Sequence, residues 1–203
     1  CDFCCGTGDI LKEFQNKGWA VQGIDISEEY TEAAKKERGL PAAQIITADA
    51  KTHCFDTEFD LVYSWHSCLG YSTEEDDKGL IANMCKHVQK NGVLAIELYN
   101  LWAISKNFKE KINYQIQYNN ILYTVTRECQ IDITKQRMNQ TWTYTSLLGK
   151  KVHTTSMRLY SPREIIIMLE TTGLSRVEIL DPSKEGIVIA DTNSSRLLFK
   201  GVK

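Results

Sequence analysis

The sequence predicts an α/β fold in which a mostly parallel sheet alternates with helices and carries an added antiparallel β segment. Apolar strand-like runs alternate with helical patterns up to about residue 98, which is typical of parallel βαβ units. Three of these runs end in an acidic residue, and the first leads into a glycine-containing turn. From residue 112 the pattern changes to period two, which indicates hairpins.

Length and composition bound the class of protein. A chain of 203 residues suits one α/β domain with an insertion. The net charge of -2 and the lack of a Lys/Arg run argue against a nucleic-acid partner. No apolar stretch reaches the roughly 20 residues of a membrane span, so we expect no membrane partner. Seven cysteines, an odd number within predicted strands and helices, favour reduced thiols in a cytoplasmic protein.

The first ten residues predict a strand, a tight turn and the start of a helix. Gly6 and Gly8 frame the turn, and the helical pattern over residues 10–17 follows at once. Such a helix start offers unpaired N–H groups to a polar ligand. Leu11 stands where the dinucleotide fingerprint has its third glycine, which argues against NAD. Because residue 1 already lies in this motif, we expect an upstream N-terminal segment to be missing.

The next two strands also end in acidic residues. Residues 20–25 read as a buried strand ending in Asp25, and residues 44–49 as a strand ending in Asp49. A carboxylate at the tip of the second strand can accept both ribose hydroxyls of an adenosine. Ser27 is the predicted N-cap of a helix over residues 28–38.

A loop rich in functional side chains follows the fourth strand. Residues 59–64 form this strand, and the loop over residues 65–71 comes directly after it. A helix is predicted over residues 74–89, then a turn at 90–92 and a fifth strand over 93–98. These elements together predict a Rossmann-like sheet, with Glu97 and Asn100 facing its crevice.

The remaining chain adds an antiparallel insert and returns to the sheet. Residues 111–159 are too few to bury a core alone, so we expect them to form a lid over the crevice within the same domain. A capping box at Ser161 begins a helix that ends near Gly173. Short strands are predicted at 174–180, 187–190 and 196–200. The core therefore comprises residues 1–110 and 160–203.

Three motifs resemble those of the class I S-adenosylmethionine (SAM) dependent methyltransferases. The motif D-x-G-x-G-x-G reads Asp2 to Gly8 here, with Cys4 in place of the first glycine. The pattern F-D-x-V followed by S-x-x-G-Y matches residues 59–71, and residues 158–173 are similar to a segment of small-molecule N-methyltransferases. These include aminosugar N,N-dimethyltransferases and glycine N-methyltransferase-like enzymes. The resemblance implies a seven-stranded Rossmann-like methyltransferase sheet with an antiparallel β lid after the fifth strand.

The resemblance also implies a ligand set. It implies SAM as cofactor, S-adenosylhomocysteine as product and a small-molecule acceptor, for which we expect an amine. The opening turn would hold the methionine part, Asp25 the ribose, and Asp49 with the backbone of Ala50 the adenine. The predicted cofactor-binding residues are Asp2, Cys4, Gly6, Gly8, Asp25, Ile26, Asp49, Ala50, Ser64 and Trp65.

The acceptor end of the site carries the catalytic hypotheses. His66 is the first candidate for taking a proton from the acceptor, because histidine titrates near neutral pH, and Tyr71 is the second. Glu97, Asn100 and Tyr160 are the predicted substrate-side residues. No metal is expected, because no second C-x-x-C pair completes a zinc site.

Two alternatives for the function stay open. The chain could transfer the methyl group to a small-molecule hydroxyl, or it could be a SAM-binding regulatory module without catalysis. The oligomeric state is also open, with a homodimer as the candidate.

Overall fold

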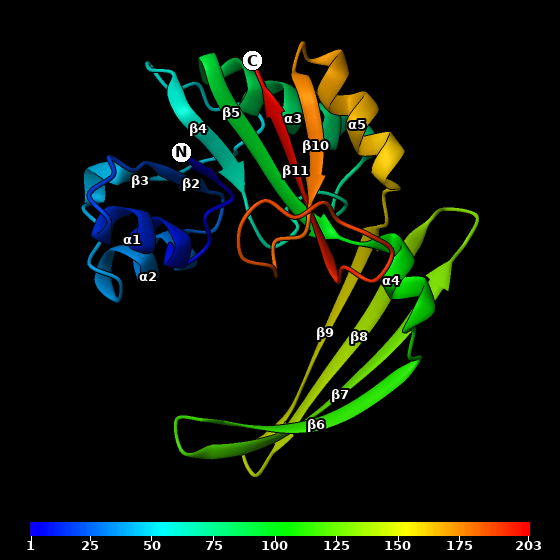
Figure 1. Cartoon of the computed structure of the whole chain (residues 1–203). Helices are drawn as coiled ribbons and strands as arrows, with labels where there is room; N and C mark the ends of the chain where they lie inside the picture. Colours follow the sequence, from blue (N-terminus) through cyan, green and yellow to red (C-terminus); the bar gives the residue numbers. More distant parts are fainter.

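A computed structural model describes residues 1–203 and contains two sheets (Figure 1). The larger sheet has seven strands in the order β10-β11-β5-β4-β1-β2-β3. The smaller has four strands in the order β6-β7-β8-β9. The predicted Rossmann-like seven-stranded fold with an antiparallel insert is therefore confirmed. The strands of the larger sheet are β1 (Asp2–Phe3), β2 (Gly23–Asp25), β3 (Ile45–Thr47), β4 (Phe59–Ser64), β5 (Val88–Tyr99), β10 (Ser175–Leu180) and β11 (Arg196–Val202).

Strand direction places the functional edge of this sheet. Strands β1 to β5 pair in parallel, whereas β11 pairs antiparallel with both β5 and β10. The chain runs outward from β1 to β3 and then returns to place β4 on the other side of β1. Ligands bind such sheets where the strand order reverses, outside the carboxyl ends of the strands. This rule points to the ends of β1 and β4.

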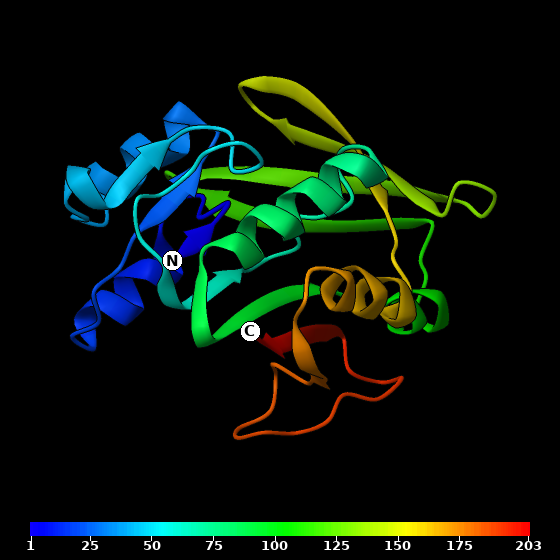
Figure 2. The ribbon, with the colours of Figure 1, turned by 90° about the horizontal axis from the view of Figure 1, so that it is seen from above.

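Helices flank the larger sheet, and α3 and α5 lie side by side against it (Figure 2). Both begin with capping boxes, in which Thr73 and Ser161 accept from the third helical N–H and the residue there bonds back. Ser27 caps α2 as predicted, through its hydroxyl and the Tyr30 N–H. The helices are α1 (Asp9–Asn16), α2 (Glu28–Lys36), α3 (Glu74–Lys86), α4 (Leu101–Lys106) and α5 (Pro162–Thr171), with a 3₁₀ turn η1 (Ala42–Gln44).

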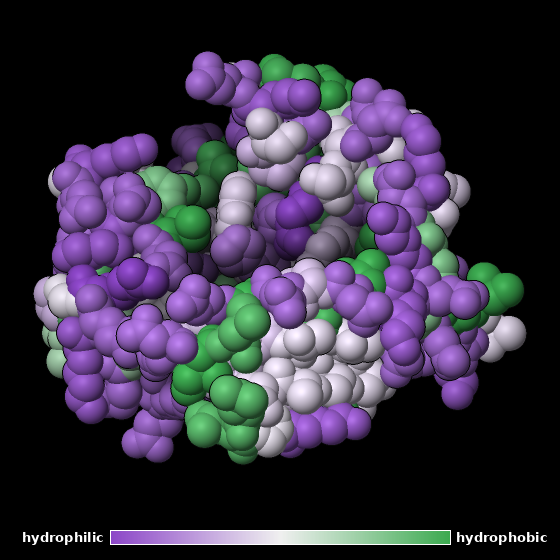
Figure 3. All heavy atoms as spheres, turned by 90° about the horizontal axis from the view of Figure 1, so that it is seen from below, coloured by the Kyte–Doolittle hydropathy of each residue, from purple (hydrophilic) through white to green (hydrophobic).

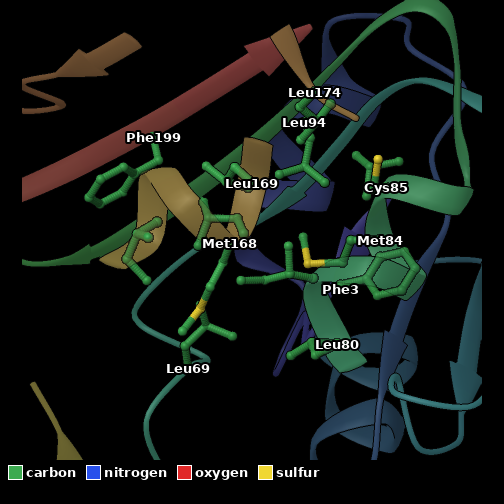
Figure 4. Packing of buried hydrophobic residues seen from close by; sticks show 14 of the residues in the cluster. Phe3, Leu69, Leu80, Met84, Cys85, Leu94, Met168, Leu169, Leu174 and Phe199 are labelled. Atoms are coloured by element: carbon green, nitrogen blue, oxygen red, sulfur yellow. The ribbon is translucent and has the colours of Figure 1, made fainter. Parts of the chain in front are cut away.

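The main core fills the space between the sheet and the pair α3 and α5. Phe3 and Phe199 come from strands at the two ends of the chain, whereas Met84 and Leu169 come from the two helices (Figure 4). All four side chains are almost completely buried. Because these buried side chains are closely packed, they hold the middle strands rigidly. The carboxyl ends of the strands can therefore position a site.

The four-stranded sheet extends away from the larger one below its carboxyl ends (Figure 1). Its base packs through Cys129, Met138, Met157 and Leu159 against residues of and near α4. Beyond this base most of its side chains are at least partly exposed. The strands are β6 (Lys111–Tyr118), β7 (Ile121–Asp132), β8 (Arg137–Ser146) and β9 (Gly149–Arg158).

Two local expectations differ from the structure, and one helix was not predicted. The predicted turn at 90–92 lies within β5, as an irregularity in which Asn91 has φ 63° and the register with β4 shifts. Residues 187–190 contribute only one bridge, between Leu180 and Ile189, instead of a strand. The helix α4 was not expected, because its six residues are too few to show a helical period.

Candidate functional site

The opening turn combines three left-handed residues. Cys4, Gly6 and Gly8 have φ values of 63°, 54° and 75°. Glycine adopts this conformation freely, but Cys4 carries a side chain in it. At Gly8 a Cβ atom would also lie 2.5 Å from Leu40 Cδ1, so this position needs glycine for packing as well. The turn thus brings backbone close to the end of β1.

Asp25 fastens this turn to the end of β2. Its Oδ2 accepts the Gly6 N–H at 2.8 Å, and its Oδ1 accepts the Ser27 N–H at 2.9 Å. The side chain is 8% exposed. Each oxygen keeps a second lone pair, so the carboxylate can organise the two turns and still accept hydroxyl groups.

Asp2 is a buried acid with an unpaired oxygen. Only 2% of the residue is exposed, and its Oδ1 has no hydrogen-bond partner. Burial raises its pKa to about 8. A buried acid of this kind would be stabilised by a cationic group placed beside it.

These side chains line one cleft at the carboxyl ends of β1, β2 and β4. Its volume is about 410 Å³. Figure 3 views this side of the molecule and shows it hollowed near its middle. The lining includes Asp2, Cys4, Cys5, Gly6, Thr7, Asp9, Ile10, Asp25, Tyr30, Trp65, His66 and Cys68. We refer to it as the strand-end cleft.

The loop over residues 65–71 enters the cleft in a strained conformation. His66 and Ser67 are consecutive left-handed residues, with φ 64° and 61°. The His66 N–H donates to Glu97 Oε2 at 2.8 Å, and the Ser67 N–H donates to the Glu97 carbonyl at 3.1 Å. These bonds hold the backbone so that the His66 side chain is exposed at the cleft.

Glu97 is engaged by the protein itself. It is 1% exposed and forms an ion pair with Arg196, whose Nη2 lies 2.6 Å from Oε2. The structure therefore places this predicted substrate-side residue beneath the 65–71 loop. Both of its side-chain oxygens therefore bond within the protein.

The other end of the loop is held by Asp77. Its Oδ2 accepts the Gly70 N–H at 2.9 Å and the Tyr160 hydroxyl at 2.7 Å. Burial, together with the hydrogen bond to the Asp77 carboxylate, raises the pKa of Tyr160 well above its usual range. Tyr160 is only 7% exposed, and the guanidinium of Arg158 lies over its ring, 4.8 Å from the centroid. Its hydroxyl therefore bonds within the protein.

The remaining predicted residues divide between the cleft edge and the interior. Asn100 is 1% exposed and donates to the carbonyls of Asp191 and Ser194, so its amide serves the loop before β11. Tyr71 is 54% exposed, and partial burial raises its pKa. Ser64 is fully buried, with no partner for its hydroxyl.

The predicted adenine-side residues lie at the neighbouring strand ends. Asp49 Oδ1 accepts the Lys51 N–H at 2.9 Å, whereas Ala50 uses its carbonyl to accept from Asn83. Neither residue lines the strand-end cleft. Ile26, directly after Asp25, is 72% exposed. An exposed aliphatic side chain beside the Asp25 carboxylate offers an apolar surface to a ligand.

Sequence reasoning missed Arg196, Asp77 and Cys68. Asp77 lies in the acidic first turn of α3, and only the fold turns it toward Gly70. Arg196 lies 129 residues from Ser67, which it contacts, so no local pattern could reveal it. Cys68 lines the cleft near Cys4, and contact between the two thiols raises the pKa of Cys4.

All seven cysteines are free thiols. The structure holds no group of three or more His, Cys, Asp or Glu side chains arranged to bind a metal ion. None of its helices is long and apolar enough to span a bilayer.

Comparison with known proteins gives matches to methyltransferases. Residues 1–92 match the family described as a methyltransferase domain. The dTDP-3-amino-3,4,6-trideoxy-alpha-D-glucopyranose N,N-dimethyltransferase of Streptomyces venezuelae is 30% identical over 97 residues, which cover 47% of this chain and 40% of that enzyme. The chain spans less than half the length of the curated relatives it matches.

Solved structures match over almost the whole chain. A SAM-dependent methyltransferase from Clostridium acetobutylicum has a TM-score of 0.80 at 16% identity, covering 99% of this chain and 82% of that one. DesVI of Streptomyces venezuelae has a TM-score of 0.75 at 24% identity, covering 99% and 81%. The chain therefore has the fold of the class I SAM-dependent methyltransferases throughout, and its residues 1–92 are similar to the methyltransferase domain family.

Proposed function

We propose that the chain transfers a methyl group from SAM to a small-molecule amine. The observation that carries this proposal is the strand-end cleft, where two buried carboxylates, a left-handed turn and an exposed imidazole meet. SAM supplies, when bound, a methyl group on a positively charged sulfur, and its loss leaves a neutral thioether. The protein has to hold that group, align the acceptor and exclude water.

The residues in and beside the cleft suit the parts of SAM by charge and shape. Asp2, an acid whose Oδ1 is unpaired, would hold the ammonium of the methionine part. Asp25 would accept the ribose hydroxyls through its remaining lone pairs. Asp49 and the backbone of Ala50 would bind the adenine amine, while Ile26 would cover one face of the ring. Gly6 and Gly8 allow close backbone approach, Trp65 would complete the wall, and the buried Ser64 would support it from behind.

The 65–71 loop would form the acceptor side. His66 is exposed at the cleft and would take a proton from the acceptor, leaving a neutral nitrogen for attack. Tyr71, also exposed, would orient the acceptor through its hydroxyl. The sheet of residues 111–159 would close over this side as a lid. Glu97, Asn100 and Tyr160 would act by supporting these groups, because their polar atoms already bond within the protein.

The preference for an amine, and for amino sugars as the class, follows from the curated relative from Streptomyces venezuelae, named for N,N-dimethylation of an amino sugar nucleotide. A small-molecule hydroxyl is the competing acceptor. The two chemistries differ in what the base must do, since a hydroxyl has to lose its proton during attack, whereas a neutral amine can attack first.

The test combines binding with turnover. Calorimetry should show S-adenosylhomocysteine binding to the wild-type chain, and SAM with a labelled methyl group should label amino sugar nucleotides but not their hydroxyl counterparts. His66→Ala should lower turnover far more than cofactor affinity. Labelling of hydroxyls alone would replace the amine by an O-acceptor, binding without any transfer would favour a regulatory module, and absence of binding would refute the proposal.

A further inference from the structure

The 65–71 loop contains two strained residues that need external support. Left-handed backbone is strained for a non-glycine residue, and His66 and Ser67 adopt it in succession. Two such residues in succession keep this conformation only where surrounding contacts stabilise it. The contacts come from β5 and β11, strands that follow the loop by about 30 and 130 residues.

One guanidinium joins these contacts. Arg196 Nη2 donates to Ser67 Oγ at 2.8 Å and to Glu97 Oε2 at 2.6 Å, while Nε pairs with Glu97 Oε1. The same Glu97 Oε2 accepts the His66 N–H. Arg196 thus holds Ser67 directly and fixes the orientation of the carboxylate that holds His66.

The sheet register explains why an arginine can do this. Arg196 pairs with Tyr99 across the antiparallel strands, and Leu198 pairs with Glu97. Side chains two residues apart share a face, so Arg196 lies over Tyr99 and diagonal to Glu97. Its guanidinium carbon is 4.1 Å from the centre of the Tyr99 ring. A planar guanidinium can stack flat on the ring while its fork bonds both partners, a geometry that the tetrahedral ammonium of lysine lacks.

We propose that Arg196 is a positioning residue for methyl transfer, which acts through Glu97 and Ser67 by holding the backbone that presents His66 to the acceptor. This inference rests on the proposed function for its kinetic consequence. The geometry it concerns can be tested without cofactor or acceptor, so the two can fail separately.

The first variant is Arg196→Lys, which keeps the positive charge beside the buried Glu97 but removes the fork. We expect kcat to fall at least tenfold, with S-adenosylhomocysteine affinity within about threefold of wild type. We also expect the backbone amides of His66 and Ser67 to exchange with deuterium at least tenfold faster. Arg163→Lys, at an exposed position on α5, is the matched control and should change neither quantity.

The outcomes separate a positioning role from other roles. Wild-type kcat in Arg196→Lys overturns the inference, because charge alone would then suffice. A fall in kcat without faster exchange also overturns it, since Arg196 would then act on the acceptor directly. If Arg196→Lys fails to fold, Glu97→Gln with Arg196→Met removes both charges together and should show the same faster exchange. If the wild-type chain transfers no methyl group, the proposed function fails, while the exchange comparison still decides whether Arg196 holds the loop.

Discussion

Several residues of this site have an unusual backbone conformation in addition to their chemical groups. Cys4, His66 and Ser67 all take left-handed values of φ without being glycine. Each carries a strain of about 1–2 kcal/mol that surrounding contacts have to offset. At His66 and Ser67 the contacts are visible, as bonds to Glu97 and Arg196. At Cys4 the corresponding methyltransferase motif has a glycine.

Replacing Cys4 by glycine should therefore stabilise the chain. We expect Cys4→Gly to raise the free energy of unfolding by up to about 1 kcal/mol, because the relief of strain exceeds the added entropy of the unfolded chain. Urea unfolding measures this, and S-adenosylhomocysteine affinity should be unchanged or tighter. Gly8→Ala is the opposite control, since its Cβ would meet Leu40. A large loss of affinity in Cys4→Gly would show that the thiol takes part in binding.

The buried Asp2 should make stability depend on pH. Its pKa is 3.8 in ordinary surroundings and about 8 in the fold, because burial disfavours the charge. Between these values the folded chain holds a proton that the unfolded chain has released, so the free energy of unfolding falls as pH rises toward 8. Asp2→Asn should flatten this slope and stabilise the chain at pH 8 by about 1–3 kcal/mol.

Urea unfolding of the wild-type and Asp2→Asn proteins between pH 5 and pH 9 would check the Asp2 prediction. If the free energies of unfolding of the two proteins changed with pH in parallel, the prediction would be contradicted. The asparagine variant should also bind S-adenosylhomocysteine at least tenfold more weakly, since the proposed partner of the ammonium would then be uncharged.

The sequence revealed residues whose role is local. Asp25 ends a readable strand, and its contacts to Gly6 and Ser27 lie within that local unit and the motif before it. Glu97 also ended a readable strand, yet its partner Arg196 was invisible. A carboxylate at a strand end is compatible with substrate contact and with an internal ion pair. Only the pairing of β5 with β11 decides between them.

At the scale of elements, the 65–71 loop is held by contacts from several strands and one helix. The 65–71 loop bonds to β5 and β11 near His66, and to α3 and β9 near Gly70. Arg137 on β8 adds a further link, donating to the Gly70 carbonyl at 3.0 Å and to Ser156 Oγ at 2.8 Å. It therefore joins the four-stranded sheet to the proposed acceptor side.

Loss of this link should affect the acceptor more than the cofactor. We expect Arg137→Met to raise the KM for the acceptor about threefold to tenfold, as for the loss of about one hydrogen bond, with S-adenosylhomocysteine affinity unchanged. Lys111→Met is the control in the same sheet, because the ion pair of Lys111 with Glu128 is exposed and contributes little. Equal changes in the KM for the acceptor in both variants would show that the contacts of Arg137 do not matter for acceptor binding.

The accuracy of the predicted elements follows the strength of their patterns. Phe59–Ser64 and the capping box at Ser161 were predicted to the residue, because a buried strand and a proline-containing helix start are strong local signals. The turn expected at 90–92 lies inside β5, since sheet pairing absorbs the left-handed Asn91 as an irregularity. The helix α4 was missed because it is short and capped by Asn100, a residue read as functional.

For the whole molecule, the strand order gathers the site from the entire chain. Strands β1, β2 and β4 supply the strand-end cleft, β5 and β11 support its loop, and the four-stranded sheet lies beyond it. A ligand that joins these parts should stabilise the whole fold. The gain at a concentration of 100 Kd is about 2.7 kcal/mol.

Scanning calorimetry would measure this stabilisation. For a chain of this size S-adenosylhomocysteine at 100 Kd should raise Tm by about 5–10 °C. NAD should produce no shift, because Leu11 stands where the dinucleotide fingerprint needs glycine. A shift with NAD alone would contradict the assignment of the cleft.

The contact between Arg196 and Ser67 also sets the order in which the protein can mature during synthesis. Strands β1 to β5 lie in the first half of the chain, so the groups proposed to bind the cofactor leave the ribosome early. Arg196, which bonds to the 65–71 loop, follows Ser67 by 129 residues. A nascent chain could therefore acquire its cofactor-binding half well before it can catalyse, and catalytic competence would wait for the pairing of β11 with β5.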